Sequence, residues 1–288
     1  MQKASFQKTE VVISDGYKLA VRIYGDLKPN AAAILVAGAT GVPQRYYRRF
    51  AAGLAATTPV ITFDFRGVGE SRYGALRGFE ASFLDWARLD LTSMVAWALE
   101  RAQILVVGHS FGGHAFGLLE NANATLGLIT FGTGPGNHIY MTRKEALRTQ
   151  LLWNLIGPIL TSIYGYLPSR LVGLGEDLPL GVYKQWKRWC KFKYYWFDDP
   201  KVNFAPLFSS VKVPVVAVNT TDDQWAPPFA GKAFMQYYDQ CPLKLISISP
   251  EEYEVDKIAH MGYFHSKCLA RTTELVQDCL PPKLGEKV

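Results

Sequence analysis

The chain has 288 residues, a formal net charge of +6 and 49% hydrophobic residues. This length and hydrophobic content are sufficient for a packed core and exclude an intrinsically disordered protein. The basic residues are spread along the sequence and accompany no nucleic-acid-binding motif, so a nucleic-acid partner is not expected. The sequence does not indicate an oligomeric state.

The N-terminal residues MQKASFQKTEVV contain no apolar core of the kind found in signal peptides. The four cysteines lack the close paired spacing of a zinc site. We therefore expect free thiols, a cytoplasmic location, and neither a metal nor an organic cofactor. The cysteines are Cys190, Cys241, Cys268 and Cys279.

Strand-like and helix-like runs alternate along most of the chain, which is typical of a mostly parallel sheet flanked by helices. The Asp15-Gly16 pair predicts a hairpin between the first two strands. Helices are expected over 46–56, over 81–102 and over 114–122, after the break at 108–113. The predicted strands, eight in all, cover 9–14, 17–25, 31–38, 58–67, 104–107, 126–132, 213–220 and 244–250.

The alternation stops between residues 134 and 208, where the sequence is rich in aromatic residues and has helical rather than strand-like spacing. This pattern predicts a helical cap inserted over the carboxyl edge of the sheet. The core domain would then comprise residues 1–133 and 209–288.

Two segments of the predicted cap have alternative interpretations. Residues 151–168 are apolar, but Asn154 and the Gly157-Pro158 pair argue against a membrane-spanning helix. A buried or substrate-facing helix pair is favoured, and a segment that touches a membrane is the alternative. Residues 183–193 alternate basic and aromatic side chains, which would suit an anionic surface; an amphipathic helix with a basic solvated face is favoured.

The run ILVVGHSFGG at 104–113 places a serine between glycines where a buried strand passes into a predicted helix. Gly108-His109-Ser110-Phe111-Gly112 fits the G-x-S-x-G pattern, in which a tight turn exposes the serine hydroxyl at the end of a sheet. The pattern predicts that Ser110 is a nucleophile. The alternative is a packing turn in which Ser110 caps the following helix.

A serine nucleophile needs a base, and the base needs an orienting acid. Among the five histidines, His260 lies in a loop after the last predicted strand, from which it can return to Ser110. Asp222 and Asp223 follow the strand at 213–220. We take Asp223 as the orienting acid, with Asp222 as the alternative, and expect the other carboxylate to accept backbone amides or to face solvent.

An oxyanion hole requires backbone amides close to the nucleophile. The amide of Phe111 and one from the loop VAGATGVPQ at 36–44 suit this role, and Ala39 is the expected second donor. The glycines of that loop would also suit a phosphate site, but the Lys-Ser/Thr ending of a Walker loop is absent.

The order Ser110, acid, His260 resembles that of the α/β-hydrolase superfamily, and DFRGVGES at 64–71 resembles its loop after the fourth strand. The resemblance covers roughly residues 8–275. The stretches at 178–200, DDQWAP at 222–227 and IAHMGYF at 258–264 are similar to predicted bacterial α/β-hydrolases related to serine aminopeptidase-like and lysophospholipase-like enzymes. Ala37-Gly38 departs from the His-Gly of many members, although the expected oxyanion donor is a backbone group.

These features predict a serine hydrolase that cleaves an ester, thioester or amide of a small substrate through an acyl-enzyme. An acyltransferase with the same triad and a non-catalytic binding protein are the alternatives. Because residues 137–197 are rich in apolar side chains, we expect an apolar substrate cavity. The polar and helix-breaking residues within 151–168 lead us to expect no stable membrane insertion. Aromatic residues of this stretch, some of which should line the cavity, include Trp153, Trp186, Trp189 and Trp196.

Overall fold

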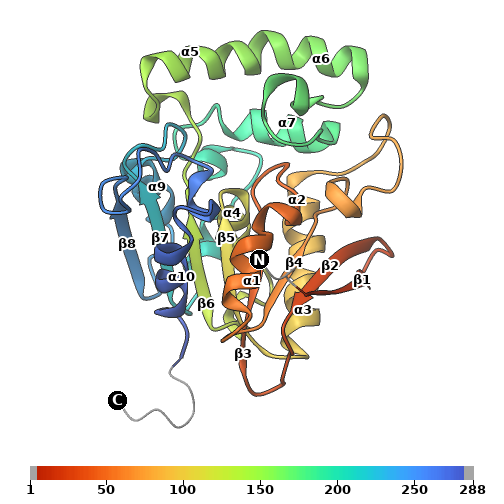
Figure 1. Ribbon diagram of the computed structural model, residues 1–288. Helices are drawn as coiled ribbons and strands as arrows, with labels where there is room; N and C mark the ends of the chain where they lie inside the picture. The colour runs from red at the N-terminus through yellow and green to blue at the C-terminus, as the bar shows by residue number, and fades with distance from the viewer. Residues whose placement is uncertain (1–4, 282–288) are drawn as a thin grey trace.

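An eight-stranded sheet organises the molecule, with strand order β1-β2-β4-β3-β5-β6-β7-β8 (Figure 1). The computed structural model describes residues 5–281. β1 pairs antiparallel with β2, and β2 antiparallel with β4, whereas all later neighbours are parallel. The predicted mostly parallel α/β-hydrolase sheet is thus confirmed. The strands are β1 Gln7–Val12, β2 Lys18–Tyr24, β3 Ala32–Ala37, β4 Val60–Phe63, β5 Gln103–His109, β6 Gly127–Phe131, β7 Val215–Thr220 and β8 Leu243–Ile248.

Helices cover both faces of this sheet. They include the predicted helix at 46–56, found as α1, and the predicted helix at 81–102, which is divided by a π-helical segment at Trp86–Leu91. The α-helices are α1 Arg48–Leu54, α2 Phe83–Asp85, α3 Thr92–Leu99, α4 Phe111–Ala115, α5 Arg143–Leu151, α6 Gly157–Tyr164, α7 Leu180–Trp189, α8 Ala205–Ser209, α9 Pro228–Met235 and α10 Leu269–Gln277.

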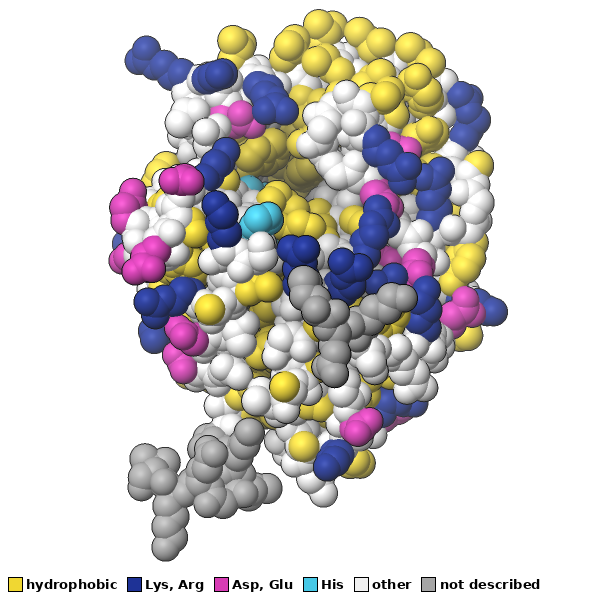
Figure 2. Space-filling view, viewed as in Figure 1, with side chains coloured by type: hydrophobic (Ala, Val, Ile, Leu, Met, Phe, Trp, Pro, Cys, Tyr) yellow, Lys and Arg dark blue, Asp and Glu magenta, His cyan; other side chains and the backbone are white. Residues whose placement is uncertain are grey.

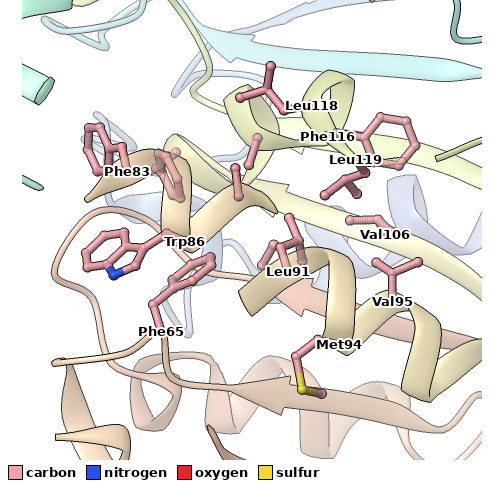
Figure 3. Close-up of a cluster of buried hydrophobic side chains, with 14 of the residues drawn as sticks. Phe65, Phe83, Trp86, Leu91, Met94, Val95, Val106, Phe116, Leu118 and Leu119 are labelled. Atoms are coloured by element: carbon pink, nitrogen blue, oxygen red, sulfur yellow. The ribbon is translucent and has the colours of Figure 1, made fainter. Parts of the chain in front are cut away.

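The two faces of the sheet belong to two separate apolar clusters, which explains why the central strands are continuous hydrophobic runs. Successive side chains of a strand point to opposite faces. Ile104 and Val106 of β5 therefore join the cluster under α3 and α9, and Leu105 and Val107 join the cluster under α1 and α10. Figure 3 shows part of the first cluster, where Phe65 lies beside Trp86. The two rings stack with their centroids 5.0 Å apart. β5 is therefore packed on both faces up to the residues before Ser110.

The helices α5, α6 and α7 lie together beyond one end of the sheet, above α4 (Figure 1). Between residues 134 and 208 the structure has helices and turns and only an isolated bridge between Leu167 and Leu178. In the described part of the chain, no helix combines the length and apolar character needed to cross a bilayer.

Candidate active site

Ser110 occupies the turn between β5 and α4, at the end of the sheet that faces α5 to α7. Its backbone has φ 50° and ψ −108°, a conformation that side-chain-bearing residues rarely adopt. Such strain typically costs about 1–3 kcal/mol and is held by surrounding structure. Here the Ser110 amide donates to the carbonyl of Phe131 at 2.9 Å, which fixes the turn against β6.

The glycines around Ser110 are required by close packing of the turn. A Cβ at Gly112 would lie 2.0 Å from the Ala37 carbonyl oxygen, and one at Gly113 would lie 1.9 Å from Thr130 Oγ1. These contacts are far inside van der Waals separation, so the helix can begin this close to β3 and β6 only with glycine. The small residues of the sequence pattern therefore set the position of the serine.

The structure brings Ser110, His260 and Asp223 into one hydrogen-bonded row. His260 Nε2 lies 3.0 Å from Ser110 Oγ, and His260 Nδ1 lies 2.8 Å from Asp223 Oδ2. The carboxylate accepts a hydrogen bond from the N–H at Nδ1, so the single proton of the neutral ring stays on Nδ1. Nε2 then carries no proton and can accept a hydrogen bond from the serine hydroxyl. This arrangement can activate a serine for attack on a carbonyl.

The electrostatics of the row keep Asp223 charged. Burial by itself would raise the pKa of Asp223, but the charge and hydrogen bond of His260 and the amides of Ala226 and Trp225 together hold it below its ordinary range. For His260, burial acts to lower the pKa, and the Asp223 charge and hydrogen bond outweigh it, so the pKa lies above its ordinary value. The pair therefore favours an ionised acid beside a histidine with increased proton affinity.

Asp222 points away from this row and holds the histidine loop by its backbone. Its carboxylate accepts from the amide of Ile258 at 2.9 Å, from the amide of Ala259 at 2.9 and 3.0 Å, and from Thr220 Oγ1 at 2.7 Å. Ala259 has φ 49°, so its strained backbone is supported by these bonds. Of the two adjacent acids, Asp223 contacts the imidazole and Asp222 the loop that carries it.

The amides of Phe111 and Ala39, which were expected to face an oxyanion, differ from each other in their hydrogen bonding. Phe111 is the first residue of α4, where an amide has no partner within the helix. The Ala39 amide donates to Tyr47 Oη at 2.9 Å, so it would reach an oxyanion only after leaving Tyr47. The next residue, Thr40, lines the cavity above Ser110, and its amide makes no hydrogen bond to any described residue.

Tyr47 and His109 form a buried network that the sequence pattern did not indicate. His109 Nε2 lies 2.9 Å from the His260 carbonyl, to which it must donate. His109 Nδ1 then accepts from Tyr47 Oη, also at 2.9 Å. Burial, reinforced by the charge of His260, lowers the pKa of His109 to about 3, which matches a neutral ring. The network joins the loop of Ala39 to the backbone of His260.

A cavity of about 710 Å³ lies above Ser110. Its apolar wall includes residues from the segment between 134 and 208, and Trp186 is the only one of the four tryptophans named above that lines it. Trp153, Trp189 and Trp196 are buried in the core instead. The apolar lining residues of this segment include Leu151, Leu152, Ile156, Val172, Leu174 and Trp186.

Polar side chains also line the cavity, among them Glu145 and His114. Trp225, whose amide binds Asp223, donates its indole N–H to Glu145 Oε1 at 3.0 Å. His114 also lines the cavity and lies 2.7 Å by Nε2 from the Gly134 carbonyl. Its ring stacks on Tyr195, which also lines the cavity, an interaction between elements that sequence spacing cannot indicate.

Among the described residues, no group of three or more His, Cys, Asp or Glu side chains is arranged to hold a metal ion. The site geometry, together with the sheet topology, defines the class of fold as that of the α/β hydrolases.

Comparison with known proteins agrees with this class. Residues 33–255 match the model of a family described as the alpha/beta hydrolase family, so the chain belongs to that family. No curated protein sequence matches the chain.

Solved structures share the fold at low sequence identity. DcsB in complex with its substrate analogue is 16% identical, with a TM-score of 0.65 over 96% of this chain and 98% of that one. An esterase from Thermogutta terrifontis is 15% identical, with a TM-score of 0.59 over 94% of this chain and 97% of the esterase. A thioesterase domain from the curacin biosynthetic pathway is 14% identical, with a TM-score of 0.59 over 95% of this chain and 99% of that domain.

Proposed function

We propose that the protein is a serine hydrolase that cleaves an ester or thioester of a small apolar substrate, with Ser110 as nucleophile. The observation that carries this proposal is the hydrogen-bonded row from Ser110 Oγ through His260 to Asp223, with distances of 3.0 and 2.8 Å. The strained turn at Ser110 supports it, because strain of this kind is retained at sites where it serves a function.

Each residue of the row has a defined role in this mechanism. Ser110 Oγ attacks the substrate carbonyl carbon while its proton passes to His260 Nε2, and Asp223 stabilises the resulting imidazolium. The amide of Phe111 donates to the oxyanion, and the turn at 39–40 supplies the second donor: the Thr40 amide is free for this, whereas the Ala39 amide must first leave Tyr47. His260 then gives its proton to the leaving group, and water cleaves the acyl-enzyme by the same sequence.

Residues 134–208 act in this proposal as a cap that forms the acyl-binding wall. The cavity of about 710 Å³ lies between this segment and the loops at the end of the sheet, and most of its lining side chains are apolar. Such a wall binds an alkyl or acyl group by removing it from water.

The rate of hydrolysis should increase with acyl length until the cavity is filled. Each buried methylene contributes up to about 0.8 kcal/mol, or roughly fourfold in kcat/KM. p-Nitrophenyl esters from acetate to decanoate measure this. Ile156→Trp, in the cavity wall, should move the optimum to shorter chains, and Ile159→Trp, on the exposed side of the helix, should not. A series that falls from acetate onward would contradict an acyl pocket.

The proposal also predicts a pH profile. His260 accepts the serine proton only when neutral, and Asp223 raises the pKa of His260 above its ordinary value of 6.5. kcat/KM should therefore rise with pH and level off only above a midpoint higher than 6.5. In Asp223→Asn the residual activity should have a lower midpoint, because the charge that raises the pKa is gone. An unchanged midpoint would remove Asp223 from this role.

Labelling by a fluorophosphonate probe tests the assignment directly. The serine oxygen displaces fluoride from phosphorus, so modification should map to the peptide that contains Ser110 and be absent in Ser110→Ala. A non-catalytic binding protein would not be labelled.

A second assay separates hydrolysis from acyl transfer. A primary alcohol is added to the ester assay, and the amount of ester formed with that alcohol is measured.

A further inference from the structure

The outer face of the long helix above the cavity is apolar and lies in solvent. Residues 143–164 form a continuous helical segment made of α5, a π-helical turn at Leu152–Ile156, and α6. Every fourth residue along it is a large aliphatic side chain that is about half exposed or more. These are Leu147 at 72%, Leu151 at 46%, Leu155 at 52%, Ile159 at 50% and Ile163 at 58% exposure. We call these five residues the aliphatic row.

The fold itself does not require the aliphatic row. The same helical segment packs inward through the side chains of Leu152 and Trp153 and through the backbone of Gly157, where the helix approaches Tyr183 closely. Figure 2 shows hydrophobic side chains gathered in a band over the top of the molecule, where α5 and α6 lie. A contiguous exposed apolar surface of this kind marks an interaction site in a globular protein.

Basic side chains lie beside this band at two places. At its beginning, Arg143, Lys144 and Arg148 are exposed on α5. Beside α6, a groove of about 640 Å³ has Thr161 and Ser162 on one side and basic side chains of the α7 region on the other. The basic residues of the groove are Lys184, Lys187, Arg188 and Lys191.

The groove is an unneutralised cationic surface. Arg188 pairs with Asp199, but Lys184, Lys187 and Lys191 form no ion pair with a carboxylate of the described residues. Partial burial and the charge of Lys191 both lower the pKa of Lys187, which indicates that like charges are crowded there. Hydroxyl and ammonium donors around a groove match the oxygens of a phosphate group.

We propose that the aliphatic row and the lysine-lined groove together dock the protein peripherally on an anionic phospholipid bilayer. The aliphatic side chains enter the boundary between headgroups and acyl chains, and the lysines contact the lipid phosphates. Apolar residues beside a basic rim are the features by which interfacial helices bind such membranes.

Charge complementarity selects the bilayer over a second copy of the chain. A twofold interface through this face would bring the basic residues of one copy against those of the other. A bilayer that contains phosphatidylglycerol presents a negatively charged surface to these basic residues.

The docking face adjoins the cavity. Leu151 and Arg148 belong both to the exposed surface and to the cavity lining, so a lipid-soluble substrate could pass from the bilayer to Ser110 without crossing bulk water. This consequence rests on the proposed function, whereas the docking itself does not.

Cosedimentation of the full-length protein with vesicles tests the proposal. We expect binding to vesicles of phosphatidylcholine and phosphatidylglycerol in equal amounts, and much weaker binding to phosphatidylcholine alone. Each basic residue at an anionic surface contributes about fivefold, so Lys184→Gln/Lys187→Gln/Lys191→Gln should lose on the order of a hundredfold in affinity. Leu155→Gln/Ile159→Gln should lose at least about tenfold, because two side chains no longer enter the interface.

Matched variants control for charge and hydrophobicity. Lys28→Gln/Lys212→Gln/Lys232→Gln removes the same charge from exposed positions elsewhere, and Val12→Gln/Leu245→Gln removes exposed apolar side chains from β1 and β8. Both should bind vesicles like the wild type. Equal losses in these controls, or no binding by the wild type, would overturn the proposal.

Two further measurements separate the remaining outcomes. Hydrolysis of a short soluble ester without vesicles should be unchanged in Leu155→Gln/Ile159→Gln, and Ser110→Ala should bind vesicles normally even though it is inactive. A wild-type dimer in sedimentation equilibrium that Leu155→Gln/Ile159→Gln dissociates, without vesicle binding, would make the face a contact between copies and refute docking.

Discussion

Replacement of Ser110 by alanine is expected to reduce ester hydrolysis by roughly 10⁴–10⁶-fold, because nucleophile and base act as a unit and loss of either removes the covalent route. The side chain makes one hydrogen bond in the row, to His260. Alanine also keeps the same strained backbone, so the thermal midpoint should change little. Steady-state turnover of a p-nitrophenyl ester and a circular-dichroism melt measure the two effects.

Ser110→Gly provides the companion measurement. Glycine adopts φ near 50° without steric cost, so this variant should be inactive yet more stable than the wild type by about 1 kcal/mol. Greater stability together with lost activity would show that the strain serves the site rather than the fold. A folded Ser110→Ala protein that retains more than a tenth of wild-type turnover would refute the mechanism.

Much of the fold could be predicted because its signals are local. The central strands are buried on both faces, which produces unbroken apolar runs such as Ile104 to Val107. Each such run can be recognised without knowing its neighbours. The π-helical segment at Trp86–Leu91 could not be predicted, because its hydrogen-bond pattern depends on packing of Trp86 and Leu91 against the core.

The site was predictable where chemistry restricts residue type to a short motif. Ser110 lies in such a motif, and few histidines compete with His260 for the role of base. The choice between Asp222 and Asp223 depends on which way two adjacent side chains point at the end of β7, and that is set by contacts with Ile258 and Ala259 far along the chain.

Tyr47 illustrates the limit of the sequence for the oxyanion loop. Its hydroxyl accepts from the Ala39 amide and donates to His109, residues 8 and 62 positions away. No local pattern links these groups, since the turn before α1, the loop after β3 and the end of β5 must first come together. The outward face of α5 and α6 could not be predicted for a similar reason. Helical spacing is visible in the sequence, but the neighbour against which the helix packs decides which of its apolar faces is buried.

Asp223→Asn is expected to lower kcat/KM by roughly 10⁴-fold, because the amide oxygen would keep the hydrogen bonds from Trp225 and Ala226 and the NH2 group would face His260. The NH2 group donates to Nδ1, so the ring proton moves to Nε2, which can then no longer accept the serine proton. Asp222→Asn should cost less than about a hundredfold, because its effect reaches the imidazole only through the position of the 258–259 backbone. The two variants make the same chemical change at adjacent positions. The two variants are compared by measuring kcat/KM on one ester and by recording the pH profile of each variant.

The pH profile distinguishes the two roles even if both variants lose activity. Asp223 raises the pKa of His260 by direct contact, so only Asp223→Asn should lower the midpoint of the profile. Asp222→Asn should keep the midpoint and instead lower the thermal stability, by about 1–3 kcal/mol, because buried amides lose an acceptor. A larger rate loss and a shifted midpoint in Asp222→Asn would reverse the assignment of the two acids.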